Sequence, residues 1–255
     1  IALDRLEAVR GGGSSLYGTQ ALGGVVDVRT AQPAGAPVLS LEASGGNLGT
    51  SDMVASASSG WGAWSGRISG DLYHTNGYIP VAEDERGPVD TQTGSEHKTL
   101  DVQLQRTFGE ASRVFVRGIV YSEERTNGTP LQTNATTIRT LVTGLDWNTA
   151  SAGSFTARLY GGDQGYDQSF SAVAPDRETE ALTRIQRVPA QQIGGAVTWT
   201  RALGERTRIR VAATDDAEAV RAAAVAAAAV QVALAGRPVQ RVIVVPGRIV
   251  NIVTG

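Results

Sequence analysis

The sequence predicts a mainly β protein: part of an antiparallel, membrane-spanning β-barrel, followed by a small α+β appendage. Residues 38–212 contain segments in which apolar and polar side chains alternate, as in strands with one apolar and one wet face. The connections between these segments are alternately short and long, which is typical of transmembrane barrels. An abrupt change to an Ala- and Val-rich composition near Thr214 predicts the appendage.

Composition excludes several classes of protein. The chain has 255 residues, a formal net charge of -2 and no cysteine. This net charge gives no long-range attraction to nucleic acid or anionic lipid. Without cysteine there is neither a disulfide scaffold nor a thiolate metal site. No apolar run reaches the roughly 18 residues that a membrane-spanning helix needs.

The N-terminal segment reads as two strands joined through glycine-rich turns. Alternating runs at Leu3–Arg10 and Val25–Thr30 predict the strands, and Gly11–Gly13 and Gly23–Gly24 predict the turns. We expect one short helical turn at Ser14–Tyr17 between them.

A phosphate-binding loop is not supported at these glycines. The GxGxxG spacing from Gly11 and Gly13 places Leu16 where the third glycine should stand, and no Lys-Ser or Lys-Thr follows Gly18.

The linker 31–37 contains Pro33, Gly35 and Pro37, and the barrel-like strands follow it. In the clearest strand, Trp64, Ile68 and Leu72 share one face, opposite a polar face. We predict strands at 38–45, 51–59, 64–75, 96–108, 112–124, 138–149, 154–166, 191–202 and 206–212.

The connections then alternate. Short connections are expected at 60–63, 109–112, 150–153 and 203–205. Long loops are expected at 75–95, 125–137 and 167–190, all at one end of the barrel. A soluble β-sandwich or propeller is the alternative, because alternation also occurs in half-buried sheets.

The last segment predicts a helix and a hairpin. Apolar residues recur at three- and four-residue steps from Asp215 to Ala235. Val239–Val245 and Arg248–Val253 then form two apolar strands around a turn at Pro246–Gly247.

The N-terminal stretch resembles the end of the plug domain of TonB-dependent outer-membrane receptors, where a segment of the form ERIEVVRG…SxLYGxxAxGGVxxxxT leads into the first barrel strand. The resemblance extends more weakly through the strands and Gly77–Pro80. The matching residues are Arg5, Glu7, Val9, Arg10, Gly11, Leu16, Tyr17, Gly18, Ala21, Gly23, Gly24, Val25 and Thr30.

This resemblance implies a plug remnant at 1–30, the linker at 31–37 and N-terminal barrel strands at 38–212. It implies energised uptake of a scarce ligand, such as a siderophore, cobalamin, a saccharide or a peptide, across the bacterial outer membrane. The expected partners are the TonB complex, a small extracellular ligand and outer-membrane lipid. Residues expected to anchor the plug against the barrel are Glu7, Arg10, Gly11, Tyr17, Gly18 and Gly24.

The resemblance also implies a fragment. The signal peptide and the TonB-binding segment are expected upstream of residue 1. Family barrels have about 22 strands, so we do not expect this fragment to close or to transport alone. Open sheet edges would leave backbone groups that lipid cannot satisfy.

The tail from about 210 to 254 resembles the C-terminal end of bacterial leucyl-tRNA synthetase, through Val232, Leu234–Arg237 and the run from Val239 to Val253. In that family this ending helps to hold tRNA, and the candidate phosphate contacts are Arg237, Arg241 and Arg248. Solvated surface arginines are the alternative. This alternative function is cytoplasmic, so we expect a junction between unrelated sequences at 206–217.

Candidate sites elsewhere are few. His74 and His97 flank the first long loop and, with Tyr78, are candidate ligand-facing residues. A metal site with the nearby acidic residues has no ligand spacing to support it, and we expect neither metal nor cofactor. No GxSxG motif occurs, so we expect no enzyme. Five tyrosines fit either an interfacial girdle or ligand stacking: Tyr73, Tyr78, Tyr121, Tyr160 and Tyr166.

Overall fold

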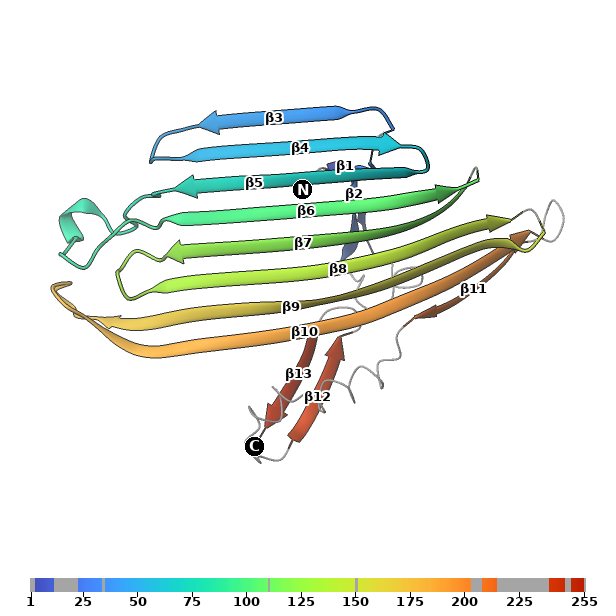
Figure 1. Cartoon of the computed structure of the whole chain (residues 1–255). Helices are drawn as coiled ribbons and strands as arrows, with labels where there is room; N and C mark the ends of the chain where they lie inside the picture. Colours follow the sequence, from blue (N-terminus) through green and yellow to red (C-terminus); the bar gives the residue numbers. More distant parts are fainter. Residues whose placement is uncertain are drawn as a thin grey trace.

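The computed structural model describes residues 3–11, 23–33, 35–109, 111–149, 151–202, 208–214, 239–245 and 249–254; for residues 25 and 27 and for those after 201, it describes only the backbone. A single antiparallel nine-stranded sheet dominates, in which every strand lies beside its neighbours in sequence (Figure 1). Its strands are β3 (Val38–Gly45), β4 (Ser51–Trp61), β5 (Trp64–Thr75), β6 (Ser95–Phe108), β7 (Ser112–Thr126), β8 (Thr133–Thr149), β9 (Gly153–Val173), β10 (Glu180–Ala202) and β11 (Arg208–Thr214).

Two separate hairpins flank this sheet in sequence. β1 (Leu3–Arg10) pairs with β2 (Gly24–Thr30), and β12 (Val239–Val245) pairs with β13 (Ile249–Thr254). Both pairs of predicted strands are therefore confirmed. The helical turn expected at 14–17 and the helix expected at 215–235 lie outside the described residues. Within the described residues no helix is long and apolar enough to cross a membrane, and a single 3-10 turn, η1, spans Glu83–Glu85.

The connections alternate in length as predicted. Those at 62–63, 109–111 and 150–152 lie at one end of the strands, called here the short-turn end. Those at 46–50, 76–94, 127–132 and 174–179 lie at the opposite end, called here the long-loop end.

The predicted loop at 167–190 is wrong, because most of it is strand. β9 runs to Val173 and β10 starts at Glu180, and β8 likewise begins at Thr133 rather than at 138. These extensions carry polar residues on both faces, so the period-two signal disappears. Pro189 pairs with Gly165 on β9, whereas β11 pairs only with the residues of β10 after Gly195. Proline is tolerated there because that side of the strand is a free edge in the described sheet.

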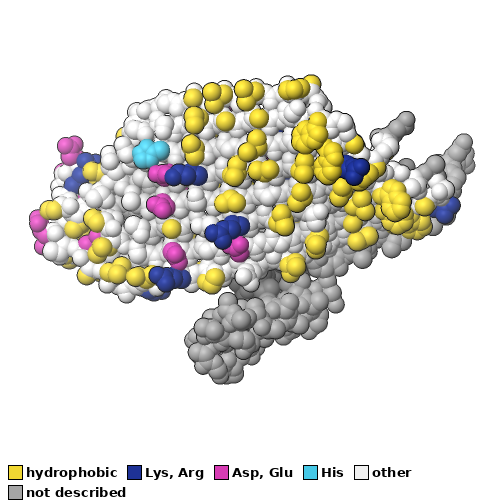
Figure 2. Space-filling view, in the orientation of Figure 1, with side chains coloured by type: hydrophobic (Ala, Val, Ile, Leu, Met, Phe, Trp, Pro, Cys, Tyr) yellow, Lys and Arg dark blue, Asp and Glu magenta, His cyan; other side chains and the backbone are white. Residues whose placement is uncertain are grey.

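The two faces of the sheet have the reverse of the usual burial. Alternate residues of β5 and β6 form a polar face that is buried: Ser65, Arg67, Ser69, Asp101, Gln103 and Gln105. The opposite, apolar face is exposed, with Ile68 at 50% and Leu100 at 47% exposed. Its hydrophobic side chains spread across neighbouring strands (Figure 2). The outward side chains share one face because register pairs Ile68 with Val102 and Leu100 with Val120.

Candidate functional site

The centre of the polar face is an ion-pair cluster built on Asp101. This carboxylate is completely buried and accepts hydrogen bonds from two arginines. Arg67 Nη2 donates at 2.9 Å, and Arg117 donates through Nε at 2.8 Å and through Nη2 at 2.7 Å. The three residues come from β5, β6 and β7, so the cluster ties three successive strands together. A carboxylate held by two guanidinium groups leaves one excess positive charge in this cluster.

The same arginines hold the segment that enters the sheet. Arg67 Nη1 donates to the backbone carbonyl of Ala31, and Arg117 Nη1 donates to Thr30 Oγ1 at 3.1 Å. Thr30 is the last residue of β2, and Ala31 begins the linker to β3. The two positively charged guanidinium groups therefore donate to neutral oxygen atoms of the linker. Such charge-assisted hydrogen bonds are stronger than those between neutral groups.

Gln32 extends this attachment. Its Oε1 accepts hydrogen bonds from Arg113 Nη1 at 2.7 Å and from Gln103 Nε2 at 3.3 Å. Arg113 is itself fixed by Asp146 of β8, through a contact of 2.8 Å. Asp146 also pairs with Arg158 of β9. A second arginine–aspartate–arginine cluster thus supports the same linker from the next strands.

Backbone contacts complete the linker's path. Gly60 N of β4 donates to Gly35 O at 3.1 Å. A Cβ added at Gly60 would lie 2.8 Å from that oxygen, so only glycine allows this approach. We call residues 30–33 and 35, with the side chains of Arg67, Asp101 and Arg117, the linker dock.

A second group of side chains lies on the polar face nearer the long-loop end. The rings of Tyr73 and His97 stack with centroids 4.7 Å apart, and Tyr121 follows at 6.1 Å. His97 Nε2 lies 3.4 Å from Asp71 Oδ2. With Glu123 and residues of the adjacent loops, these side chains line a pocket of about 470 Å³.

The tyrosines resolve one question that the sequence left open. Tyr73 and Tyr121 belong to the polar face through their register with His97 and Thr99. Tyr166 also faces that side and hydrogen-bonds to Asn134 and to Gln168 Oε1. These rings are therefore not an apolar girdle.

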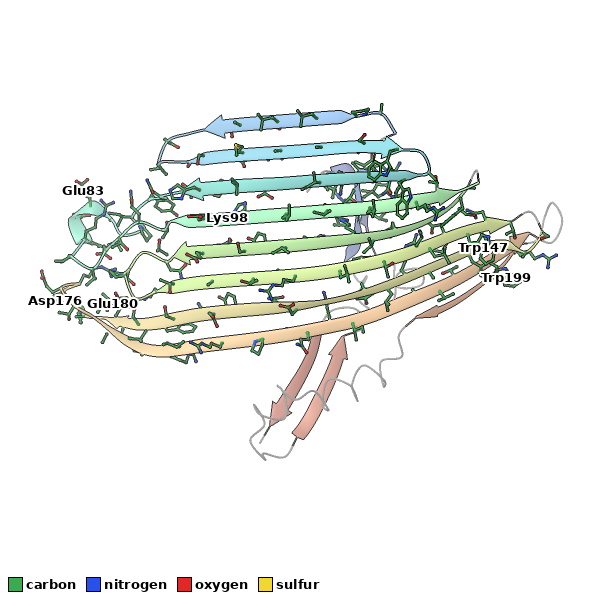
Figure 3. All side chains as sticks on the ribbon, viewed as in Figure 1. Glu83, Lys98, Trp147, Asp176, Glu180 and Trp199 are labelled. Carbon is green, nitrogen blue, oxygen red and sulfur yellow. The ribbon has the colours of Figure 1, made fainter. Side chains whose placement is uncertain are left out.

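The aromatic belt was missed by the sequence reasoning. It consists of tryptophans and phenylalanines on the apolar face at the short-turn end (Figure 3). The rings of Trp147, Phe155 and Trp199 contact in series at 6.3 and 6.2 Å. The signal was present, because each member stands close to a predicted tight turn. The belt comprises Trp61, Trp64, Phe108, Trp147, Phe155 and Trp199.

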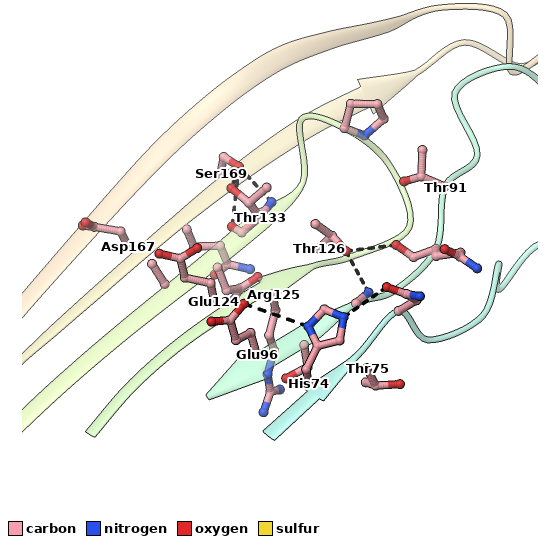
Figure 4. Close-up of a pocket in the computed structure, with 18 of the residues that line it drawn as sticks. His74, Thr75, Thr91, Glu96, Glu124, Arg125, Thr126, Thr133, Asp167 and Ser169 are labelled. Atoms are coloured by element: carbon pink, nitrogen blue, oxygen red, sulfur yellow. Dashed lines mark hydrogen bonds and ion pairs between the residues drawn. The ribbon is translucent and has the colours of Figure 1, made fainter. Parts of the chain in front are cut away.

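The two histidines lie on opposite faces. His97 pairs in register with Tyr73, so His74 points to the other side of β5. There it contacts Asn76 Oδ1 at 3.2 Å and Glu96 Oε2 at 3.9 Å, in a pocket of about 880 Å³ beneath the loops (Figure 4). The two rings cannot ligate one ion together. Among the described residues no group of three His, Asp or Glu side chains is arranged to hold a metal. Tyr78 is 63% exposed in the first long loop.

The long loops are tied to one another. Arg177 of the 174–179 connection forms a two-point ion pair with Asp90 of the first long loop, one contact being 2.7 Å. The hydrogen bonds from Arg177 lower the pKa of Asp90 to about 2, with a further bond from Gly87 N at 2.8 Å. Val89 N donates to Arg177 O at 3.4 Å.

Glu180, at the start of β10, binds the 127–132 connection at the long-loop end. Its carboxylate accepts hydrogen bonds from the hydroxyls of Thr129 and Ser171, and from Leu131 N at 3.1 Å. Burial raises the pKa of Glu180, but these bonds outweigh it and leave the pKa lowered. Glu83, Asp176 and Glu180 all lie at this end (Figure 3).

The predicted anchor residues fall partly outside the described chain. The predicted anchors Tyr17 and Gly18 are not described. Of the candidate tRNA phosphate contacts, Arg237 and Arg248 are not described either, and of Arg241 only the backbone is. The ion pairs recorded for Glu7 join Arg5 and Arg29 within its own hairpin.

Arg10, also a predicted anchor, is exposed and lies opposite Gly24 in the β1–β2 register. Gly24 has φ of 152°, and a Cβ there would lie 2.6 Å from Val9 O. Gly11 N donates to Gly23 O at 3.2 Å. These contacts close the hairpin, while anchoring to the barrel stays a prediction.

No family model matches the chain. In structure it is similar to the copper transporter OprC, with a TM-score of 0.63 and 16% identity. It is also similar to the siderophore receptor PirA from Acinetobacter baumannii, with a TM-score of 0.60 and 15% identity. The ferric enterobactin receptor PfeA from Pseudomonas aeruginosa gives a TM-score of 0.58, also at 15% identity.

Each of these structures covers 83% of this chain, which spans only 33%, 34% and 36% of them, respectively. The likeness shows the fold: the large sheet is built like part of the barrel of these receptors. The predicted partial antiparallel barrel is therefore confirmed.

A match of a different kind exists in sequence. The chain is 58% identical over 79 residues to the leucine--tRNA ligase of Thiobacillus denitrificans. That match covers 31% of this chain and 8% of the ligase.

Proposed function

We propose that this chain is a fragment of a TonB-dependent outer-membrane receptor, whose complete form takes up a scarce ligand. The structural neighbours support the receptor class, since they are a copper transporter and two siderophore-related receptors. The N-terminal hairpin is then the end of the plug, residues 31–37 the linker, and β3–β11 the first strands of the barrel. Because the titles of the neighbours name different cargoes, the ligand is proposed only as a small molecule or metal complex.

The inverted burial of the sheet carries this proposal. A sheet with a hydrated side and a hydrocarbon side needs apolar residues on the exposed face and polar residues inside. The pairs Arg67 with Asp101 inside and Ile68 with Leu100 outside meet that need. A soluble sheet would bury the second pair and expose the first.

The height of the apolar face agrees with a bilayer. On β6 the apolar face runs from Leu100 to Phe108, interrupted by Arg106 within the belt. At about 3.3 Å per residue and a tilt of about 40°, this length gives roughly 20 Å along the membrane normal. Barrels of this type carry an apolar band about 25 Å tall. The belt then marks the periplasmic interface, and the long loops are extracellular.

In this placement the linker dock holds the junction between plug and barrel on the inner wall. The Asp101 cluster fixes both arginines, and these fix Thr30 and Ala31. Force applied to the plug by the TonB complex, through the upstream segment, would reach the barrel at this point. The pocket beside His97 and Tyr121 lies on the ligand's route, with His97 as the candidate ligand-facing residue. Tyr78 in the first loop and His74 on the outer side of β5 are weaker candidates.

The fragment would not transport by itself. In the part of the chain that the structure describes, the nine-stranded sheet ends at β3 and β11, and receptors of this class close with about 22 strands.

Cell fractionation tests the proposal. The chain, exported with an added signal peptide in a Gram-negative host, is expected in the outer-membrane fraction, without the heat-modifiable migration that only a closed barrel gives. Recovery of the chain in the soluble periplasm, or its release from the membrane fraction by carbonate washing, would contradict membrane insertion.

A second candidate function rests on the sequence match to the ligase. A tail related to the synthetase's C-terminal end would contact tRNA phosphates through Arg237, Arg241 and Arg248, in the cytoplasm. Such binding weakens steeply with salt. A filter-binding titration with tRNA at two salt concentrations tests it, and the absence of salt-sensitive binding would contradict it.

A further inference from the structure

The apolar face carries unequal charges at its two ends. All acidic side chains that register places on this face of β3–β10 lie toward the long-loop end: Glu96, Glu124, Asp163, Asp167 and Glu180. Among the side chains that the structure describes, the short-turn end of the same face carries no acid. It carries two arginines, Arg106 on β6 and Arg201 on β10. Figure 2 shows the same separation, with basic but no acidic groups toward the belt.

Register fixes the direction of both arginines. Arg106 lies opposite Trp64 of β5, and Arg201 stands two residues from Trp199 on β10. Trp64 and Trp199 belong to the aromatic belt, so both arginines point to the exposed apolar face.

Aromatic rings hold Arg106 in place. Its guanidinium carbon lies 5.5 Å from the ring centre of Trp64 and 5.4 Å from that of Phe108. Contacts of this kind position the cation without neutralising it. No ion pair joins Arg106 or Arg201 to an acid in the described part of the chain. A guanidinium so oriented can donate two parallel hydrogen bonds to a phosphate.

We propose that Arg106 and Arg201 bind the phosphate of an anionic glycerophospholipid in the leaflet at the short-turn end. This rests on the proposed membrane function, which places the apolar face in lipid. Tryptophan belts sit at headgroup depth, so the two guanidinium groups lie where lipid phosphates are. At the long-loop end Lys98 and Arg187 are paired with Glu96 and Asp167, and their charge is compensated. The chain's formal net charge of -2 does not reveal this local excess of positive charge at the short-turn end.

The expected selectivity is modest. A basic residue near an anionic surface strengthens association by roughly fivefold. Each arginine should therefore contribute a preference of about fivefold for phosphatidylglycerol over phosphatidylcholine.

Tryptophan quenching by brominated lipids tests the proposal. The full chain is held in non-ionic detergent micelles containing phosphatidylglycerol or phosphatidylcholine brominated on the acyl chains. We expect phosphatidylglycerol to quench at a mole fraction lower by roughly 25-fold, about fivefold from each arginine. Arg106→Gln and Arg201→Gln should each reduce this preference about fivefold, and the double variant should abolish it.

Arg139→Gln is the matched control, because Arg139 lies on the same face toward the long-loop end, opposite Val120 and Asp163. It should leave the preference unchanged, and added inorganic phosphate should not displace the lipid. Equal quenching by both lipids in the unmodified chain, or an unchanged preference in the double variant, would overturn the proposal. Absence of quenching by either lipid would instead overturn the membrane function on which it rests.

Discussion

Asp101 and Arg117 are joined by two parallel hydrogen bonds, of 2.8 and 2.7 Å, between the neighbouring strands β6 and β7. The carboxylate is completely buried, and the Arg117 side chain is 15% exposed. A buried ion pair gains little over an apolar pair of the same shape, but losing one partner is costly. We therefore assign this ion pair a positioning role: it orients Arg117 toward the linker that follows β2.

Replacing Asp101 should destabilise the fold strongly. Asp101→Asn leaves Arg67 and Arg117 as adjacent buried cations, and breaking a buried pair in this way costs about 3–5 kcal/mol. Urea unfolding in detergent, followed by tryptophan fluorescence, measures the change. Glu42→Gln, an exposed carboxylate of β3, is the control and should change the free energy of unfolding by no more than about 0.5 kcal/mol. Equal effects of both variants would contradict the role given to the cluster.

The linker should come loose when the cluster is broken. The chain contains no cysteine, so Ala31→Cys introduces a single reactive thiol within the linker dock. In the otherwise unmodified chain, labelling by a maleimide should be slow, because Arg67 and Arg117 hold this segment. Combination with Arg117→Met should accelerate labelling under folding conditions. Identical labelling rates in the two backgrounds would show that the dock does not restrain the linker.

Much of this architecture was predictable from sequence, but only where one face meets an apolar environment. The strands at Val38–Gly45 and Trp64–Thr75 were predicted to the residue, because their alternation is strong. The outer halves of β9 and β10 were missed because polar and apolar residues are mixed on both of their faces, and a register shift between Leu182 and Arg184 breaks the period of two. The alternation of polar and apolar residues in sequence reflects a difference in environment between the two faces of the sheet. Where the two faces have similar environments, the alternation disappears.

The linker dock could not be predicted for a different reason. Asp101 follows Leu100 in an ordinary alternating strand, and nothing in its neighbours in sequence marks it as buried. Its partners lie 34 and 16 residues away. Register alone brings them together, and a one-residue slip would place Asp101 on the apolar face.

The outer face should tolerate an arginine at its edge but not at its middle. Leu104 lies midway between Leu100 and Phe108 on β6, and Leu104→Arg should cost about 2–4 kcal/mol in a bilayer. His74→Arg, on the same face at the long-loop end, should cost about 0–1 kcal/mol. Urea unfolding in lipid vesicles compares them. If the face were exposed to water, both substitutions would fall within about 0.5 kcal/mol.

Replacing Gly77 in the first long loop should destabilise the chain, whereas replacing Gly118 on β7 should not. Gly77 has φ of 66°, and a Cβ there would lie 1.9 Å from Thr93 O. Gly77→Ala should therefore displace Thr93 and lower the melting temperature. Gly118→Ala on β7 meets no atom within 4 Å, and it should leave the melting temperature unchanged or slightly raised. Thermal unfolding followed by circular dichroism distinguishes the two, and equal melting temperatures would contradict the close approach.

The tie between Asp90 and Arg177 should fail only in strong acid. The pKa of Asp90 is lowered to about 2 in the folded chain, by hydrogen bonds from Arg177 first, whereas an unfolded aspartate has a pKa of about 3.9. A lowered folded pKa gives a contribution that is present above about pH 4 and lost as the pH falls through about 2. Amide hydrogen exchange at Val89, corrected for its intrinsic pH dependence, should accelerate across this window, because Val89 N donates to Arg177 O. Asp90→Asn should show the faster exchange already at pH 7, while Asp84→Asn, in η1 of the same loop, should not. Unchanged protection of Val89 in Asp90→Asn would show that the loops are held together by other contacts.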